Sequence, residues 1–329
     1  MKRIPQLDGV RALAILAVFV HHALHVKLLW SGVDLFFILS GFLITNVLLE
    51  AKHHSLGGYF AHFYSRRVRR ILAPYLLTLL VASLFVGLAW TRHWYFYLLF
   101  TNFLRPLHIA LPVAFEPLWS LAVEEQFYLL WPLAVYFLSE RHLRRLCLAL
   151  ILAAPVLRGL FHFSAIWPIF MLTPFRMDLL AAGGLLCLVW REKPERFARR
   201  GPGLAAAFLC FGLVTLAVLG RLHITWTGNT RAGNVLIYEA TLSICLGFLL
   251  YALSGWRVGW LCWPPLRYIG KISYTMYLVH LGILNLLEPR LHGLALAAVA
   301  LAITVAYASV SWFLMERRLL QHKPAVAAA

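Results

Sequence analysis

Long apolar runs separated by short polar connections dominate the chain. A membrane-spanning helix needs roughly 20 predominantly apolar residues. Stretches of that kind occur at 7–27, 33–51, 70–90, 118–138, 145–163, 168–190, 204–220, 234–254, 270–288 and 294–315. A further aromatic stretch at 94–104 is too short to cross, so it is expected to lie at the interface or re-enter. The pattern predicts an all-α, polytopic transmembrane helical bundle of about ten spanning helices.

The basic residues are distributed unevenly between the connections. With the N-terminus placed inside, the inner connections hold about three times as many Lys and Arg residues as the outer ones. Cytoplasmic loops carry such an excess in membrane proteins. Both termini are therefore predicted to be cytoplasmic. The connections are short, so we expect one integral-membrane domain over 1–320 and a disordered Ala-rich tail over 321–329.

The composition supports a membrane environment. Hydrophobic residues make up 62% of the 329 residues, charged residues make up 13%, and the mean hydropathy is +0.77. Soluble domains have about 45–50% apolar and about 25% charged residues, so the predicted surroundings are membrane lipid. The net charge of +17 lies in connections between apolar runs rather than on a soluble face, so no nucleic-acid partner is expected. Five scattered cysteines form no zinc-like spacing, and no metal site is predicted.

Ionisable residues inside the first apolar run suggest a site. Such residues are costly within a bilayer and mark functional positions by default. At 100° per residue, Arg11 and His22 lie within about 20° of one face and roughly 16 Å apart along the axis. Asp8 extends this stripe, although a place at the cytoplasmic interface explains it equally well. An imidazole at His22 suits proton transfer near neutral pH.

Two further groups suggest how such a site is completed. Asp34 begins the second apolar run at the level of His22, where its carboxylate can orient an imidazole or simply cap a helix. Arg67 and Arg70 share a helical face at i, i+3 spacing. Two guanidinium groups there can hold a phosphate, although basic residues are expected on the cytoplasmic side in any case.

Polar residues in later runs extend the candidate list. Glu124 and Glu125 point about 100° apart on a helix, so only one of them can face a given partner, which we expect to be an intramembrane cation. Arg176 stands inside the run at 168–190. Ser273, Tyr277 and His280 lie on related faces of the ninth run, with His280 near mid-bilayer. A buried structural histidine explains His280 nearly as well as a working one.

Five blocks of this sequence together resemble integral-membrane acyltransferase family 3. They read IPQLDGVRALAILAVFVHH, GVDLFFILSGFLIT, FYSRRVRRILAPY, PLWSLAVEEQFYLLWP and SYTMYLVH, and they span residues 4–280. The resemblance implies a ten-helix membrane core, in its stand-alone form, that O-acylates sugars of polysaccharides, lipid-linked glycans or secondary metabolites.

Position by position, the resemblance assigns roles. The family's Arg and His pair of the first helix falls on Arg11 and His22. Its Arg-x-x-Arg falls on Arg67 and Arg70, which implies that these residues hold acyl-CoA phosphates. The fourth-helix block matches Trp119, Ser120 and Glu124, whereas the role of the block ending at His280 is less settled.

The resulting hypothesis is acyl transfer in a bacterial cytoplasmic (inner) membrane. Acyl-CoA, with acetyl-CoA as the expected form, donates to a hydroxyl of a carbohydrate, glycolipid or related acceptor, and His22 acts as general base or transient acyl carrier. Asp34 or Glu124 is expected to orient His22. Two alternatives stay open: a transporter that uses the same groups to couple solute movement to protons, and a scaffold in which the charges only pair. The oligomeric state is not predicted.

Overall fold

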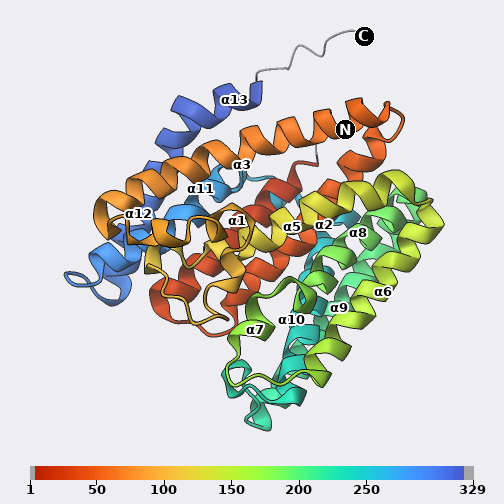
Figure 1. Ribbon diagram of the computed structural model, residues 1–329. Coiled ribbons are helices and arrows are strands. Elements are labelled where there is room, and N and C mark those ends of the chain that lie inside the picture. Colours follow the sequence, from red (N-terminus) through yellow and green to blue (C-terminus); the bar gives the residue numbers. More distant parts are fainter. Residues whose placement is uncertain (1–3, 322–329) are drawn as a thin grey trace.

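The computed structural model describes residues 4–321, which form helices joined by short connections and contain no β-strand (Figure 1). Ten helices have at least 16 residues. They are α1 (Gln6–Leu24), α2 (Gly32–Ala51), α3 (Leu56–Val86), α5 (Leu118–Phe137), α6 (Glu140–Leu160), α8 (Met177–Glu192), α9 (Pro194–Arg221), α10 (Arg231–Ser254), α11 (Pro264–Leu287) and α12 (Gly293–Ser311). The predicted all-α class is confirmed.

Shorter helical elements fill the connections. The short α-helices are α4 (Phe96–Leu99), α7 (Trp167–Met171) and α13 (Arg317–Gln321). A π-helical turn, Trp312–Glu316, joins α12 to α13. The 3₁₀ turns are Leu29–Ser31, Ala89–His93, Thr101–Phe103, Val113–Phe115, Thr173–Phe175, Trp226–Gly228 and Gly259–Cys262.

Each of the ten predicted spans overlaps one of the ten long helices. Six segments of the described chain are long and apolar enough to cross a membrane, namely α1, Leu29–Ala51, α3, α9, α10 and Gly293–Gln321. Of the other four long helices, α8 has only 16 residues, and α5, α6 and α11 carry ionisable side chains within them. The structure therefore supports a polytopic membrane protein, and the count of ten spans stays a prediction.

Two boundaries differ from the expected ones. α3 begins at Leu56, where the Ser55 side chain caps it by accepting a hydrogen bond from the Gly58 backbone N–H at 3.3 Å, so residues 56–69 are helical rather than a loop. The expected run at 168–190 is interrupted between α7 and α8. Leu172 has an extended backbone there, with φ −78° and ψ 137°, and Pro174 has no N–H with which to continue the helical hydrogen bonds.

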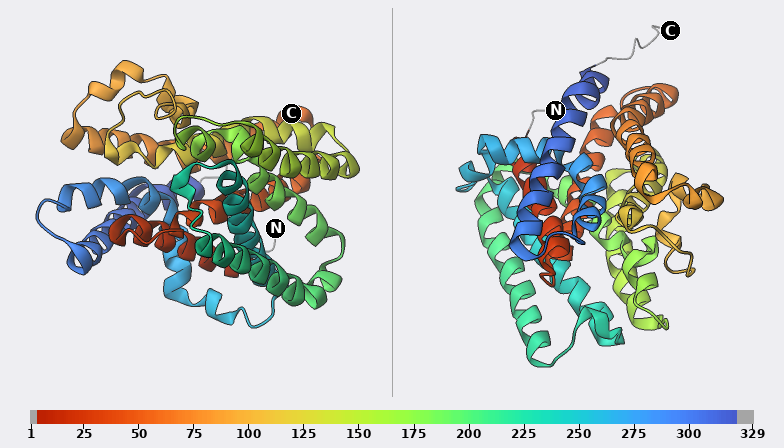
Figure 2. Two further views of the ribbon diagram at one scale, coloured as in Figure 1. Left: turned by 90° about the horizontal axis from the view of Figure 1, so that it is seen from below. Right: turned by 90° about the vertical axis from the view of Figure 1, so that its left-hand side faces the viewer.

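α2 lies at the centre of the bundle. In its most apolar stretch 72% of the residues are buried, whereas the corresponding figure for α9 is 17%. α2 packs against α1, α5, α8 and α10, and the right-hand view of Figure 2 shows the N-terminal helices between the later ones. The outer helices expose apolar side chains such as Leu80 and Phe211, as a lipid-facing surface requires.

Glycines let the central helices approach closely. A Cβ atom at Gly41 of α2 would lie 2.0 Å from the Leu180 carbonyl oxygen of α8, and one at Gly270 of α11 would lie 1.8 Å from the Asp8 carbonyl oxygen of α1. Small residues permit such backbone contact between membrane helices. The close crossings fix α1 and α2, and with them Arg11, against their neighbours.

The first turn of α1 and helix α13 lie toward the same end of the bundle (Figures 1 and 2). This arrangement is compatible with the prediction that both termini share one side of the membrane, and the side itself stays a prediction. Of the expected tail, Gln321 ends α13 and 322–329 lie outside the described residues, so the domain boundary is also still a prediction.

Candidate active site

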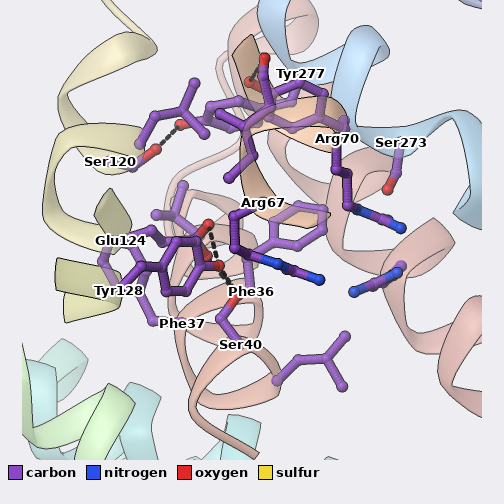
Figure 3. A pocket seen from close by; sticks show the side chains of 16 residues that line it. Phe36, Phe37, Ser40, Arg67, Arg70, Ser120, Glu124, Tyr128, Ser273 and Tyr277 are labelled. Atoms are coloured by element: carbon purple, nitrogen blue, oxygen red, sulfur yellow. Dashed lines mark hydrogen bonds between the residues drawn. The ribbon is translucent and has the colours of Figure 1, made fainter. Parts of the chain in front are cut away.

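A cavity of about 80 Å³, which we call the arginine cavity, lies between α1, α2, α3, α5 and α11. Three guanidinium groups line it, those of Arg11, Arg67 and Arg70. In Figure 3 the Arg67 and Arg70 side chains extend from α3 into a common space, with Glu124 and Tyr128 of α5 on another side of it. The cavity thus brings residues of the first, third and fourth apolar runs together.

A second cavity of about 180 Å³, the entry cavity, continues toward the N-terminal turns of α1. It shares Arg11, Arg67 and Arg70 with the arginine cavity and adds Asp8. Across both cavities three arginines face two carboxylates, Asp8 and Glu124, so the lining carries a net positive charge. Such a lining attracts an anionic ligand from the end of the bundle at which α1 begins.

The helical α3 explains how two arginines reach one cavity. Residues three positions apart lie on the same face of a helix, and this places Arg67 and Arg70 together. The Arg67 guanidinium carbon lies 5.9 Å from the ring centres of both Phe63 and Tyr128. Its Nε is buried and lacks a hydrogen-bond partner. An unused buried donor of this kind is suited to an incoming phosphate oxygen.

Glu124 is held in place by two hydroxyl groups. Ser40 Oγ donates to it at 2.6 Å, and Tyr128 Oη donates to it at 3.0 Å. Glu124 lines the arginine cavity, and its neighbour Glu125 is absent from the lining, as the angle between adjacent helix positions predicts. Glu124 shares this lining with the three arginines, and its expected ion pair with an intramembrane cation stays a prediction.

A third cavity of about 170 Å³, the histidine cavity, lies toward the C-terminal end of α1 and contains His21 and His22 in its lining. Tyr277 and Val33 line both this cavity and the arginine cavity. Arg11 and His22, expected on one face of α1, thus face two cavities that adjoin at Tyr277.

His280 is the closest described aromatic partner of His22 outside α1. The two ring centres lie 5.2 Å apart. His280 Nδ1 lies 2.7 Å from the Tyr277 carbonyl oxygen, so Nδ1 carries a proton, and in the neutral ring Nε2 is an acceptor. Nε2 is buried without a hydrogen-bond partner.

The remaining predicted residues of α5 and α11 surround Tyr277. Ser120 Oγ and Tyr277 Oη form a hydrogen bond of 2.6 Å, and Tyr277 Oη also donates to the Pro117 carbonyl at 3.2 Å. Ser273 lines the arginine cavity and donates to the Gly270 carbonyl at 3.0 Å. Trp119 lines the histidine cavity.

The expectation that Asp34 orients His22 is corrected by the structure. Asp34 is fully buried and forms an ion pair with Arg176, and it accepts a hydrogen bond from Thr241 at 2.8 Å. None of its hydrogen bonds involves His22, because the first turn of α2 directs the carboxylate toward α8 and α10. Arg176 is the partner of Asp34 in this ion pair, and it lines none of the three cavities.

Sequence reasoning missed several lining residues. Ser40 is not among the residues singled out from the sequence, yet it donates a hydrogen bond to Glu124. Tyr128 was overlooked although it follows Glu124 by four positions, a spacing at which helix side chains meet. Arg105, Glu116 and Trp167 line the histidine cavity, and nothing in their local sequence distinguishes them from ordinary outer connections. No group of three or more His, Cys, Asp or Glu within 4–321 is arranged to hold a metal ion.

Both a protein family and individual known proteins match this chain. Residues 4–316 match the acyltransferase domain of family 3. The chain is 31% identical over 320 residues to a putative peptidoglycan O-acetyltransferase, YrhL, of Bacillus subtilis, covering 87% of this chain and 49% of the relative. It is 31% identical over 334 residues to the peptidoglycan O-acetyltransferase OatA of Listeria monocytogenes, covering 88% and 51%.

A third relative, the O-acetyltransferase OatA of Staphylococcus aureus, is 28% identical over 316 residues, covering 85% of this chain and 50% of the relative. The chain thus spans about half the length of the curated relatives it matches. No solved structure matches it. With the domain match extending over almost the whole described chain, the protein belongs to the integral-membrane acyltransferase family 3.

Proposed function

We propose that this protein transfers an acetyl group from cytoplasmic acetyl-CoA to a hydroxyl of a carbohydrate or glycolipid in a bacterial cytoplasmic membrane. The observation that carries the proposal is the row of three adjoining cavities, which runs from Asp8 past the arginines to His22. An anionic donor that enters at one end and a neutral acceptor that enters at the other meet near Tyr277.

The donor side rests on the arginine and entry cavities. Arg67 and Arg70 hold the phosphates of CoA, and the unpaired Nε of Arg67 supplies a donor for them. Arg11 lines the same two cavities and stands on the same helix as His22, so it is assigned to the thioester carbonyl. Charge-assisted hydrogen bonds from guanidinium groups to phosphates are among the stronger polar contacts in proteins.

The chemical step rests on His22. The imidazole takes the proton of the acceptor hydroxyl while the hydroxyl oxygen forms a bond with the thioester carbonyl carbon. The carbon–sulfur bond then breaks, and His22 returns the proton to the departing CoA sulfur, so the base is regenerated. The His280 ring, whose centre lies 5.2 Å from that of His22, keeps the His22 ring oriented by packing, which is the part first expected of Asp34 or Glu124.

The glycan acceptor is supported by the relatives, whose names describe O-acetylation of peptidoglycan in two cases. Because the chain spans about half of their length, their whole activity is transferred here only as a proposal. The assignment of residues 1–320 to one integral-membrane acyltransferase domain is likewise a proposal.

Donor binding can be tested with a matched pair of variants. We expect purified protein in detergent to bind acetyl-CoA saturably and Arg70→Ala to weaken binding by about tenfold or more, because a hydrogen bond to a charged group contributes about 1.5–3 kcal/mol. Arg66→Ala removes the same charge from the exposed side of α3 and should bind normally. Equal binding by all three proteins would contradict the donor site.

The chemical role of His22 can be tested in the same preparation. We expect His22→Asn to lower acetyl transfer and thioester turnover by about 10²–10⁴-fold, the usual contribution of a general base, with acetyl-CoA still bound. His25→Asn, an exposed position at the end of α1, is the control. Transport of a solute by the wild-type protein without consumption of acetyl-CoA would instead support the transporter alternative.

A further inference from the structure

The lining of the histidine cavity, to which His22 belongs, also carries an ion pair of unusual construction. Arg105 Nη1 lies 3.3 Å from a Glu116 carboxylate oxygen. The Arg105 guanidinium also lies 3.7 Å from the ring centre of Trp167. The three residues come from three separate segments, just after the turn Thr101–Phe103, just after the turn Val113–Phe115, and the start of α7. All three line the cavity.

Stability does not explain this arrangement. The Arg105 and Glu116 side chains are 37% and 28% exposed, and ion pairs that water reaches contribute only about 0–1 kcal/mol. The contact with Trp167 fixes the plane of the guanidinium. A charged pair held rigid at a cavity wall, yet left accessible, has donors and acceptors that an incoming ligand can use.

The rest of the cavity is suited to a sugar. Trp30, Trp119, Phe170 and Tyr277 supply aromatic walls, and small-ligand sites are typically apolar pockets with a few fixed polar groups. A water needs about 10–15 Å³ by the same volume measure, so about 170 Å³ has room for one monosaccharide unit.

The charges of the wall define which sugar fits. The positive charge of Arg105 is balanced by Glu116, and among the residues that line the cavity these are the only Arg, Lys, Asp or Glu side chains. A neutral sugar can accept hydrogen bonds from Arg105 and donate them to Glu116 without disturbing the pair. An acidic sugar or a phosphate must instead place its charge beside the Glu116 carboxylate.

We propose that Arg105, Glu116 and Trp167 form an acceptor subsite that binds one neutral sugar unit in the cavity that His22 lines and disfavours acidic sugars. This inference rests on the proposed acetyl transfer, since it assigns the acceptor side of the same site. Arg105 and Glu116 are specificity-determining residues that hold the sugar while His22 acts on its hydroxyl.

The test measures binding of two oligosaccharides to the purified full chain by tryptophan fluorescence. N-acetylchitotetraose is the neutral probe, and tetragalacturonic acid is the acidic probe. We expect wild-type protein to favour the neutral probe. Glu116→Gln frees Arg105 for a carboxylate, so we expect it to bind the acidic probe about tenfold more tightly than wild type does, the scale of one hydrogen bond to a charged group.

Two variants complete the design. Arg105→Gln should weaken binding of the neutral probe and should not strengthen binding of the acidic probe, because no cation is left to bind the acidic sugar. Glu288→Gln removes the same charge at an exposed position beyond α11 and should leave both affinities unchanged. A gain of acidic binding is a readout that misfolding cannot produce.

The possible failures can be told apart. Equal binding of the two probes by wild-type protein, or unchanged preference in Glu116→Gln, overturns the subsite. Acetyl transfer from acetyl-CoA to N-acetylchitotetraose is followed in parallel. If the charge preference switches as expected but no acetyl-CoA is consumed, the sugar subsite stands and the proposed transfer fails.

Discussion

Two groups of arginines occupy this bundle and differ in what surrounds them. In the first, which we call the α8 network, Arg158 and Arg176 are fully buried. Arg158 contacts Asp178, Glu239 and the Phe175 carbonyl, each at 2.6 Å. Arg176 pairs with Asp34. In the second group, Arg11, Arg67 and Arg70 line cavities.

The same side chain thus serves two purposes within this helical bundle. The two arginines of the α8 network meet three carboxylates, and the rings of Trp30, Phe170 and Tyr238 lie within 5.5 Å of the Arg176 guanidinium. The charge is therefore neutralised within the protein. The three cavity arginines share their cavities with two carboxylates, so a positive charge is left for a ligand. The predictions below test this division.

Breaking the α8 network should have the largest effect on stability. Arg176→Met leaves Asp34 as a buried charge without its cation, and removing one partner of a buried pair costs about 3–5 kcal/mol. Thermal unfolding in detergent should show a large loss of stability. The double variant Asp34→Leu with Arg176→Met removes both charges and should recover most of it.

The reverse pattern would contradict the division between the two groups. If Arg176→Met unfolds at the wild-type temperature but loses acetyl transfer, the α8 network belongs to the chemistry rather than to the scaffold.

Changing a cavity arginine should affect ligand binding instead. Arg67→Gln removes the guanidinium with the unused Nε, and we expect acetyl-CoA affinity to fall by about 10–100-fold, because charge-assisted hydrogen bonds contribute about 1.5–3 kcal/mol. The unfolding temperature should stay close to that of wild type. Calorimetric titration measures the acetyl-CoA affinity, and thermal unfolding of the same sample measures the stability.

A third test concerns the packing of α2 against α8. A Cβ atom at Gly183 would lie 2.0 Å from the Ile38 carbonyl oxygen, so Gly183→Ala forces α2 and α8 apart and should cost about 1–3 kcal/mol. Gly203→Ala on α9 meets no atom within 4 Å and serves as the control. Equal unfolding temperatures for the two variants would show that the α2–α8 contact is not limiting.

Local helix geometry explains which parts of the site could be predicted from the sequence. The spacing of Arg11 and His22 fixes them on one face of α1 wherever the helix packs, and the same holds for Arg67 and Arg70. The all-α fold followed from run lengths alone. The start of α3 was missed because residues 56–69 are polar on several sides, and an apolar run does not reveal a helix that extends beyond it.

Partners across helices could not be predicted in this way. Asp34 stands in the first turn of α2, where the sequence allows His22, His25 and Arg176 as partner cations. Only the packing of α2 against α8 selects Arg176. The pair of Arg105 and Glu116 joins two irregular connections, whose course has no periodicity that a sequence pattern can reveal.

The smallest expected effect lies at the boundary between the arginine cavity and the histidine cavity. Tyr277→Phe keeps the ring that lines both cavities and removes the hydroxyl that bonds to Ser120 and Pro117. One such hydrogen bond contributes about 0.5–1.5 kcal/mol, so unfolding should shift only slightly. Because Pro117 and Trp119 belong to the wall of the histidine cavity, we expect kcat to fall while acetyl-CoA affinity stays unchanged. Weaker acetyl-CoA binding with unchanged kcat would instead place Tyr277 on the donor side, and the boundary between the two cavities would then lie beyond it, closer to His22.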